Sequence, residues 1–325
     1  MNPLHTIIDR FKGKRVVVFG DLVADVFVYG EISRISREAP VLILNHRETQ
    51  LVPGGGANAI HNLWSLGATP LPVGLVGDDA EGQQLLAYFS NLGIDTSGIV
   101  IAKSYRTPSK MRILGGAVPT QRQQIVRIDS GSPLQDDKTR SVVERNVKLA
   151  LRDAEALLVS DYGYALTTPH LVSTLRRASM PATIDSRFSL MSFSGMTAAT
   201  PNEPEVEAAL GITIGNDADK LESAGRTLLR KLRHDALLIT RGKDGMALFE
   251  RGRKTTHLPI HGSDEVADVT GAGDPVIATF TLALAAGASY YDAARLANYA
   301  GGIVVMKYGT RPVTREELIH ETSSS

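Results

Sequence analysis

The sequence contains no cysteine, and this absence removes several kinds of chemistry. A chain of 325 residues without Cys cannot form disulfides, thiolate metal sites or cysteine nucleophiles. It also has no excess of charge, because 35 basic residues balance 35 acidic ones. Proteins that coat nucleic acid or anionic membranes usually carry a basic excess. We therefore expect a small-molecule partner, and neither nucleic acid nor a membrane.

Long apolar runs are missing too. The longest weakly polar run, residues 276–288, is well short of the roughly 20 residues that cross a bilayer. The first residues (MNPLHTIIDRFKGKR) lack the apolar core of a secretory signal. With 43% hydrophobic residues, the chain is nevertheless able to bury a large core, as one domain or as two. These features favour a cytoplasmic protein of enzyme size.

Strand-like and helix-like segments alternate along most of the chain. Arg15–Gly20 (RVVVFG) is a β-branched run typical of a buried strand in a parallel sheet. Further strands are expected at 155–160, 182–185 and 236–240, and helices at 79–92, 168–178, 203–210 and 217–232. This alternation predicts an α/β fold, with a mostly parallel central sheet wrapped by helices.

Two segments break this alternation. Residues 41–52 and 108–128 are strand-like and polar, with no helix within them. They predict a small β flap over a site, which would bring basic residues together. Those residues are Lys110, Arg112, Arg122 and Arg127. The solvated face of an exposed sheet explains any single one of them equally well.

Carboxylates follow several predicted strands. Asp21 and Asp25 come after the first strand, and Asp161 and Asp185 fall just past later ones. In open α/β sheets, ligands bind at the carboxyl ends of the strands, where such groups accept hydrogen bonds from hydroxyls. Capping of loops and helices is the alternative.

The stretch Asp268–Pro275 (DVTGAGDP) is the strongest candidate for phosphate chemistry. Gly271, Ala272 and Gly273 have almost no side chains, so their N–H groups can approach an anion at the start of a helix. Asp274 beside such an anion is unfavourable unless it takes a proton from an attacking hydroxyl. A plain helix start, with Asp274 as N-cap and Pro275 at the first helical position, explains the same residues equally well.

A second glycine cluster, Gly54-Gly55-Gly56-Ala57-Asn58, precedes a helical pattern. With Asn62, it suits backbone and amide contacts to a polyol. Its Gly-x-Gly-x-x-Ala spacing also matches a dinucleotide fingerprint, although the residues before it are polar and not those of a buried strand. An NAD-dependent oxidoreductase is therefore an alternative of a different class.

Taken together, the motifs resemble those of the ribokinase-like carbohydrate kinase superfamily over nearly the whole chain. In family order they are Gly20-Asp21 with Asp25, Gly54–Asn58, Asn202-x-x-Glu205, Thr240-x-Gly242-x-x-Gly245, and Asp268-x-Thr270-Gly271-Ala272-Gly273-Asp274. Within this superfamily, the chain looks like the kinases of D-glycero-D-manno-heptose 7-phosphate. That likeness lies in residues 30–40 (GEISRISREAP), PGGGAN, Ser160-Asp161-Tyr162-Gly163 and Lys307-x-Gly309-Thr310.

The resemblance implies an enzyme that uses ATP and Mg²⁺ to phosphorylate the C1 hydroxyl of this sugar phosphate, in lipopolysaccharide-precursor synthesis. It makes Asp274 the catalytic base, with Gly271, Ala272 and Gly273 as the anion hole. The residues implied for the nucleotide and Mg²⁺ are Asn202, Glu205 (to Mg²⁺ through water), Thr240, Gly242, Gly245 and Asn298. Those implied for the sugar are Asp25, Gly55, Gly56, Asn58 and Asp185, and we expect its phosphate to meet Lys110, Arg112 or Arg127.

The resemblance also implies an architecture: a single domain over residues 1–325, with a β lid from insertions at about 26–52 and 103–129 that often makes a dimer. Some relatives carry a fused nucleotidyltransferase, and we expect this chain to act as the stand-alone kinase. Two residues depart from the family pattern, because Pro275 stands where Thr or Ser is usual and Tyr164 where Lys is frequent. Another sugar kinase and a non-catalytic sugar sensor are the remaining alternatives.

Overall fold

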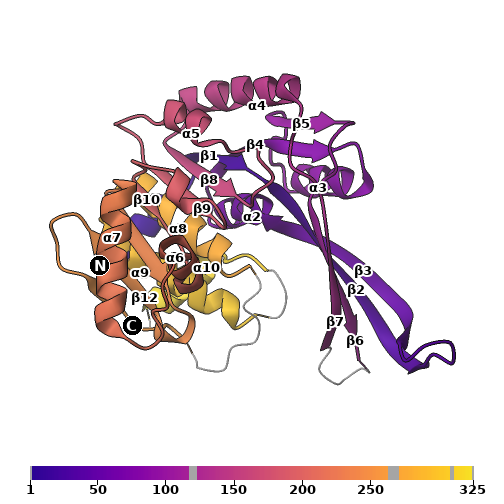
Figure 1. Cartoon of the computed structure of the whole chain (residues 1–325). Coiled ribbons are helices and arrows are strands. Elements are labelled where there is room, and N and C mark those ends of the chain that lie inside the picture. Colours follow the sequence, from indigo (N-terminus) through magenta and orange to yellow (C-terminus); the bar gives the residue numbers. More distant parts are fainter. Residues whose placement is uncertain (1, 117–122, 263–270, 308–310, 324–325) are drawn as a thin grey trace.

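The larger of two sheets has nine strands and forms the centre of the molecule. The structure is a computed structural model that describes residues 2–116, 123–262, 271–307 and 311–323 (Figure 1). Its strand order is β13-β12-β11-β10-β9-β8-β1-β4-β5, parallel from β5 to β11, with β12 and β13 added antiparallel. The strands are β1 (Arg15–Gly20), β4 (Thr69–Gly77), β5 (Ile99–Ala102), β8 (Ala156–Asp161), β9 (Ala182–Ser186), β10 (Ala198–Ala199), β11 (Ala236–Thr240), β12 (Met246–Glu250) and β13 (Thr256–Leu258).

Helices cover both faces of this sheet, because its central strands are apolar on both sides. In β1, Val16 and Val18 face one hydrophobic cluster, while Val17 and Phe19 face the other. The first cluster includes residues of α1 (Pro3–Asp9), α2 (Gly56–Ser65), α3 (Ala80–Asn91), α8 (Gly273–Ala285), α9 (Tyr290–Val305) and α10 (Arg315–Ser323). The second includes residues of α4 (Asp137–Ala150), α5 (Pro169–Leu175), α6 (Glu203–Leu210) and α7 (Ala218–Leu232). The predicted α/β class is confirmed.

A second, four-stranded sheet projects from the body and is called the lid sheet below (Figure 1). Its order is β3 (Leu42–Gly55), β2 (Leu22–Ile35), β6 (Ser109–Gly115) and β7 (Gln123–Ser130). Strands β2 and β6 pair in parallel, and the outer pairs are antiparallel. The two polar segments of the sequence therefore do pair through β2, whose early residues Leu22, Ala24 and Val26 are buried in the body's core.

Three predicted features differ from the structure or lie outside it. Helix α5 ends at Leu175 and not at residue 178. Helix α8 begins at Gly273, two residues before Pro275. Arg122, Asp268, Thr270, Gly309 and Thr310 lie outside the described residues. In the described part of the chain, no helix is long and apolar enough to cross a membrane.

The parallel strands direct their carboxyl ends to one edge of the large sheet. Asp21 follows β1, Asp161 ends β8, Asp185 lies next to the end of β9, and Thr240 ends β11. The base of the lid sheet and the first turn of α8 meet the same edge, where they share a cavity with Asp185 and Thr240. The fold thus assembles its polar groups at the edge where ligands bind in open α/β sheets.

The packing of α7 on β12 yields a test of the core. Gly225 faces Phe249 so closely that a Cβ atom at residue 225 would lie 2.2 Å from Phe249 Cζ. We expect Gly225→Ala to lower the melting temperature, because overpacking costs about 1–3 kcal/mol and outweighs the roughly 1 kcal/mol gained in helix propensity. The exposed Ser223→Ala in the same helix should leave stability unchanged or raise it. A Gly225→Ala variant as stable as the parent in thermal unfolding would contradict this packing.

Candidate functional site

A cavity of about 360 Å³ opens at the carboxyl edge of the large sheet, beneath the lid sheet. Its lining includes these predicted residues: Asp25, Gly55, Lys110, Arg112, Arg127, Asp185, Asn202, Glu205, Thr240, Gly271, Ala272, Gly273 and Asp274. It also includes Tyr162, Thr200 and Arg187. Five predicted residues are not among the described residues that line it, namely Gly56, Asn58, Gly242, Gly245 and Asn298.

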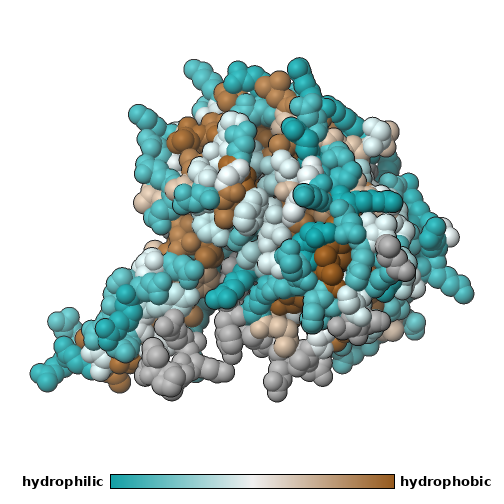
Figure 2. All heavy atoms as spheres, turned by 180° about the vertical axis from the view of Figure 1, so that it is seen from behind, coloured by the Kyte–Doolittle hydropathy of each residue, from teal (hydrophilic) through white to brown (hydrophobic). Residues whose placement is uncertain are grey.

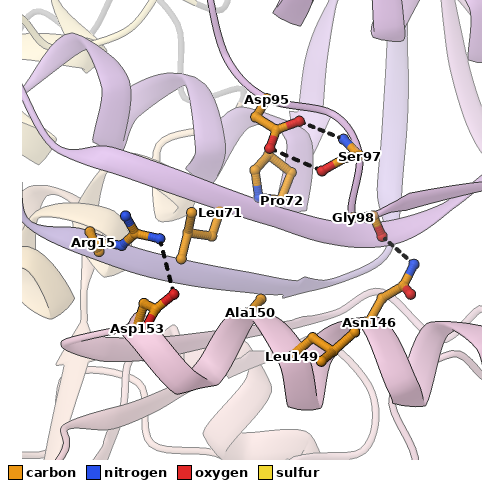
Figure 3. Close-up of a pocket in the computed structure, with 10 residues that line it drawn as sticks. All are labelled: Arg15, Leu71, Pro72, Asp95, Ser97, Gly98, Asn146, Leu149, Ala150 and Asp153. Atoms are coloured by element: carbon orange, nitrogen blue, oxygen red, sulfur yellow. Dashed lines mark hydrogen bonds and ion pairs between the residues drawn. The ribbon is translucent and has the colours of Figure 1, made fainter.

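A smaller cavity of about 240 Å³ lies near the amino ends of β1 and β4 (Figure 3). Its polar groups bond to one another: Asp95 accepts from Ser97, the half-buried Asn146 donates to the Gly98 carbonyl, and Arg15 lies 3.8 Å from Asp153. Because no buried or unpaired polar group faces it among the described residues, we attach no chemistry to it.

Asp274 is the buried carboxylate at the base of the larger cavity. It lies in the first turn of α8, whose N-cap is Ala272, and its side chain does not cap the helix. The interpretation of Asp274 as an N-cap is therefore wrong. Its carboxylate is 3% exposed and accepts one hydrogen bond on each oxygen, from Asn58 Nδ2 to Oδ2 at 2.8 Å and from the Tyr162 hydroxyl to Oδ1 at 2.9 Å.

Burial raises the pKa of Asp274 to about 7, because the charged carboxylate loses its hydration. The hydrogen bonds from Asn58 and Tyr162 oppose this rise by stabilising the charged form, the nearby Asp25 adds to it, and Lys110 opposes it. A carboxyl group with a pKa near 7 exchanges protons readily at neutral pH, as a general base must.

Asn58 supports this carboxylate and does not face the cavity. Its Nδ2 also lies 3.4 Å from the Gly271 carbonyl, and its Oδ1 accepts from Asn62 Nδ2 at 3.0 Å. Asn62 is fully buried, and its own Oδ1 accepts from the Val313 N–H at 3.1 Å. Both amides bond to protein groups, so a contact of Asn58 with a sugar stays a prediction.

The glycines before α2 allow close packing at the mouth of the cavity. A Cβ atom on Gly54 would lie 2.4 Å from Asp25 Oδ2, and one on Gly56 would lie 2.9 Å from the Asp21 carbonyl. Gly55 has φ +54° and lies beside the Tyr162 ring. These glycines end a strand of the lid sheet that pairs antiparallel with β2, so the βαβ unit of a dinucleotide fingerprint is absent there and that alternative is wrong.

Three cations of the lid sheet approach the cavity from one face of β6 and β7. Arg112 and Arg127 are opposite each other in the strand register, and Lys110 is two residues before Arg112. Arg112 Nη1 contacts Asp25 Oδ1 at 2.6 Å, with both side chains buried, while Arg127 pairs with Asp129 at 2.8 Å in a half-exposed position. These two are thus neutralised by carboxylates on the protein.

Lys110 is the lid cation without such a direct pairing. No described carboxylate lies within ion-pair distance of its Nζ, which lies 4.7 Å above the centre of the Tyr162 ring. Burial is the main reason that the pKa of Lys110 is lowered, with a further contribution from the cation of Arg187. Lys110 is therefore the lid cation best placed to meet an anion that enters the cavity.

Three cavity residues, Tyr162, Thr200 and Arg187, were missed as site residues in the sequence. Tyr162 contributed only to the family likeness of Ser160–Gly163. Arg187 lies two residues beyond Asp185 and is exposed at the cavity wall, with its guanidinium 5.8 Å from the Phe188 ring. A cation directly after a strand that ends at the ligand edge was the available signal for Arg187.

Asn202 and Glu205 line the cavity from the start of α6. They form a capping box in which Glu205 Oε2 accepts from the Asn202 N–H at 2.9 Å and Asn202 Oδ1 accepts from the Glu205 N–H at 2.8 Å. Burial is the main cause of the raised pKa of Glu205, and likewise of the strongly raised pKa of Asp185, to which Glu205 adds. No group of three metal-ligating side chains occurs among the described residues. One carboxylate with a free oxygen suits a Mg²⁺ ion that keeps its waters and binds phosphates.

The remaining predicted residues lie on the β11–β12 hairpin and on α9. Thr240 lines the cavity, whereas Gly242 (φ +54°) and Gly245 (φ +75°) flank the turn that follows it. A Cβ atom on Gly245 would lie 2.1 Å from the Leu258 carbonyl, so glycine is required there. Asn298 is half-buried, and its Nδ2 donates to the Pro259 carbonyl at 2.8 Å.

Comparison with known proteins identifies relatives over nearly the whole chain. The model of the pfkB family carbohydrate kinases matches residues 14–317. Proteins named "Bifunctional protein HldE" are 38% identical over 323 residues in Mesorhizobium japonicum, 36% over 324 in Coxiella burnetii and 40% over 310 in Geobacter sulfurreducens. These alignments cover 97%, 98% and 93% of this chain, but only 63%, 66% and 62% of the relatives.

Solved structures show the same fold at low sequence identity. Arabidopsis thaliana ribokinase, complexed with ribose and ATP, matches with a TM-score of 0.74 and 21% identity, over 97% of this chain and 100% of that one. Escherichia coli phosphofructokinase-2 matches with a TM-score of 0.81 and 16% identity, over 96% and 99%. The ribokinase-like fold predicted from the sequence is thus confirmed.

The raised pKa of Asp274 predicts that the free energy of unfolding falls as pH rises from about 4 to about 7. As pH rises from the unfolded pKa near 4 to the folded pKa of about 7, the unfolded chain loses a proton that the folded chain retains, so folding becomes less favourable. The amide of an Asp274→Asn variant cannot ionise. We expect the stability of this variant relative to the parent to rise by roughly 2–3 kcal/mol between pH 5 and pH 8, in urea unfolding. A difference that stays constant over this pH range would refute the raised pKa of Asp274.

Proposed function

This chain belongs to the pfkB family of carbohydrate kinases, and we propose that it transfers the γ-phosphoryl group of ATP to the C1 hydroxyl of D-glycero-D-manno-heptose 7-phosphate. Two sources support this substrate: the sequence likeness to kinases of this sugar phosphate, and the HldE relatives at 36–40% identity. Since the chain spans less than two thirds of the length of the first of these relatives, action without a fused nucleotidyltransferase stays a prediction. A cytoplasmic location is part of the same proposal.

The observation that carries the proposal is a buried carboxylate that shares a cavity with cations, two of which have no carboxylate partner on the protein. Lys110, Arg112, Arg127 and Arg187 line the cavity that contains Asp274; Arg112 and Arg127 pair with Asp25 and Asp129, whereas Lys110 and Arg187 have no described carboxylate within ion-pair distance. A neutral sugar needs no such set of cations, whereas a sugar phosphate brings a dianion that a closed site must neutralise. The cavity therefore suits a substrate that already carries a phosphate group.

Asp274 would act as the base of the reaction. The C1 oxygen attacks the γ-phosphorus, its proton passes to Asp274, and the bond from phosphorus to the ADP oxygen breaks. The substrate hydroxyl needs a free lone pair on the carboxylate, and each oxygen of Asp274 retains one beyond the hydrogen bond that it accepts. Positioning and electrostatics supply most of the acceleration in this kind of chemistry.

The start of α8 would face the transferred phosphoryl group. Gly271, Ala272 and Gly273 line the cavity, and a Cβ atom on Gly273 would meet no described atom within 4 Å, so an anion has room to approach. The first N–H groups of a helix have no partner within it and favour a negative charge. Pro275 is the third helical residue, where the missing N–H breaks no helical hydrogen bond, so its departure from the family pattern leaves the glycines available.

Mg²⁺ bound with ATP would neutralise phosphate charge at the wall formed by α6. Glu205 would hold it through water, and Asn202 would keep the Glu205 carboxylate oriented through the capping box. Asp25 of β2 and Asp185 of β9 line the cavity and would accept hydrogen bonds from sugar hydroxyls. Thr240 would contact the nucleotide at the same wall, with Gly242, Gly245 and Asn298 shaping the adjacent loops.

We also propose that two copies pair through the lid sheet. Its distal half exposes Ile32, Ile35, Val41 and Leu42 on β2, β3 and their connection, and Ile125 and Val126 on β7, while Ile128, opposite Met111 and nearer the body, is also exposed. Ile35 is 65% exposed. Figure 2 shows apolar residues near the tip of the projecting sheet, at the lower left. Exposed apolar residues on a sheet with open edges favour association with a second sheet of the same kind.

A turnover assay with ATP tests the substrate directly. We expect phosphorylation of D-glycero-D-manno-heptose 7-phosphate to exceed that of unphosphorylated heptose, hexoses and pentoses.

Lys110→Ala should raise KM for the sugar phosphate about 10-fold or more, since a charge-assisted hydrogen bond contributes on the order of 1.5–3 kcal/mol, while KM for ATP stays nearly constant. The exposed Lys103→Ala is the matched control. A preference for an unphosphorylated sugar would leave another sugar kinase of this family as the function.

The dimer can be tested by charge substitution at the lid. Ile35→Lys should convert the dimer to a monomer in light scattering after size-exclusion chromatography, because an ammonium group cannot be buried between apolar surfaces without a partner. Ile101→Lys introduces the same charge at a residue that is 56% exposed on β5, in the body, and should leave the mass unchanged. A parent protein that is monomeric at micromolar concentration would rule out this interface.

A further inference from the structure

Tyr162 holds one of the two hydrogen bonds to the carboxylate of Asp274. Its hydroxyl donates to Oδ1 at 2.9 Å, while Asn58 Nδ2 donates to Oδ2 at 2.8 Å. We propose that Tyr162 is a positioning residue, which fixes the orientation of the carboxylate that receives the substrate's proton. This inference rests on the proposed role of Asp274 as the base.

The two donors act on different oxygens and come from different parts of the fold. Asn58 belongs to α2, and Tyr162 belongs to the loop after β8. A carboxylate held on both oxygens cannot rotate about its Cβ–Cγ bond without losing both hydrogen bonds at their observed lengths. With the Tyr162 hydroxyl removed, only Asn58 would orient the group, and it would rotate more freely. Misplacement of a reacting group by small distances is costly in rate.

The loop that carries Tyr162 is itself tied to two buried carboxylates. Asp21 Oδ2 accepts from the N–H groups of Tyr162 at 2.8 Å and Tyr164 at 3.2 Å. Asp161 accepts from the Gly163 N–H at 3.2 Å and from the Ser186 hydroxyl at 2.6 Å. Asp21 and Asp161 are 1% and 3% exposed, so these hydrogen bonds are shielded from water. These hydrogen bonds hold the backbone of the loop independently of the contact between the Tyr162 side chain and Asp274.

The ring of Tyr162 is held as firmly as its backbone. Lys110 of the lid sheet lies over one face, and Gly55 lies against the ring edge, where a Cβ atom would be 3.1 Å from Tyr162 Cε2. Because the ring contacts the lid sheet, the start of α2 and Asp274 together, the hydroxyl has little freedom to leave its acceptor.

The same hydrogen bond favours the charged form of Asp274. The Tyr162 hydroxyl has a pKa raised well above its usual value, mainly by burial and then by the charge of Asp274, so it stays a donor at neutral pH. Loss of this donor should therefore raise the pKa of Asp274 further. The other ionisable groups that act on Asp274 are Asp25 and Lys110 of the lid sheet and Asp185 of β9.

Tyr162→Phe tests the proposal, because it removes the hydroxyl and keeps the ring. With the best sugar substrate of the parent, kcat at pH 7 should fall on the order of 10-fold or more, while KM for ATP stays within about twofold. The acidic limb of the pH profile of kcat/KM should move to higher pH, so that the deficit narrows as pH rises. A purely structural role predicts a loss of equal size at every pH, and that result would overturn the proposal.

Tyr164→Phe is the matched control. Tyr164 lies in the same loop and bonds to Asp21 through its backbone, but among the described residues no hydrogen bond to its hydroxyl links it to Asp274. Its pH profile should match that of the parent.

The carboxyl group can also be observed without turnover. In ¹³C NMR of the protein labelled at aspartate Cγ, the signal lost in Asp274→Asn identifies Asp274. We expect it to titrate at higher pH in Tyr162→Phe than in the parent and in Tyr164→Phe. An unchanged titration would overturn the inference whatever sugar the enzyme uses, so its failure is distinguishable from that of the proposed substrate.

Discussion

The structure depends on keeping a carboxylate charged where water is excluded. Asp274 is nearly inaccessible, and burial alone would favour its neutral form, which cannot accept a proton. Two hydrogen bonds, from Asn58 and Tyr162, oppose that tendency, and further hydrogen bonds hold each donor in place. Asn58 bonds to Asn62, which in turn accepts from the Val313 N–H. The loop that carries Tyr162 donates to Asp21. Asp21 is a second buried carboxylate of this kind. Its Oδ1 has no described partner, and burial raises its pKa to about 7. Burying these carboxylates lowers the free energy of unfolding, and such a loss of stability commonly accompanies a reactive group in a buried site.

The lid sheet contributes charge to the site in three different ways. Arg112 pairs with Asp25 in a buried position, so its charge is balanced within the protein. Arg127 is half-exposed and paired with Asp129, so salt would screen most of its effect. Lys110 alone lies over Tyr162 and is free to meet a phosphate. Lys110, Arg112 and Arg127 are therefore not equivalent binding groups. The strand pattern of the sequence could not show this difference, because it does not reveal their partners.

Local patterns predicted the fold well and the partners of the site poorly. The strands Arg15–Gly20 and Ala236–Thr240 and the helix Glu203–Leu210 have the predicted bounds, because β-branched runs and an Asn N-cap are local signals. Asn58 was assigned to the sugar, yet it bonds to Asp274, which is 216 residues away, and Tyr162 reaches the same group across 112 residues. Such contacts depend on how α2, the β8 loop and α8 pack, and no local pattern encodes that. Arg187 was missed for a simpler reason, since one basic residue in a loop carries no periodic signal.

The hydrogen bond between Asn62 and the Val313 N–H has a consequence for the order in which the molecule is assembled. It joins residues 251 positions apart, and the side chain of Asn2 likewise bonds to the Thr322 carbonyl across 320 residues. During synthesis, the large sheet and the lid sheet emerge from the ribosome well before the last helix. The support behind Asn58 is complete only when that final segment docks. The nascent chain would thus fold most of the cavity before the Asp274 carboxylate has its full support, which would be complete only once the segment that contains Val313 has docked.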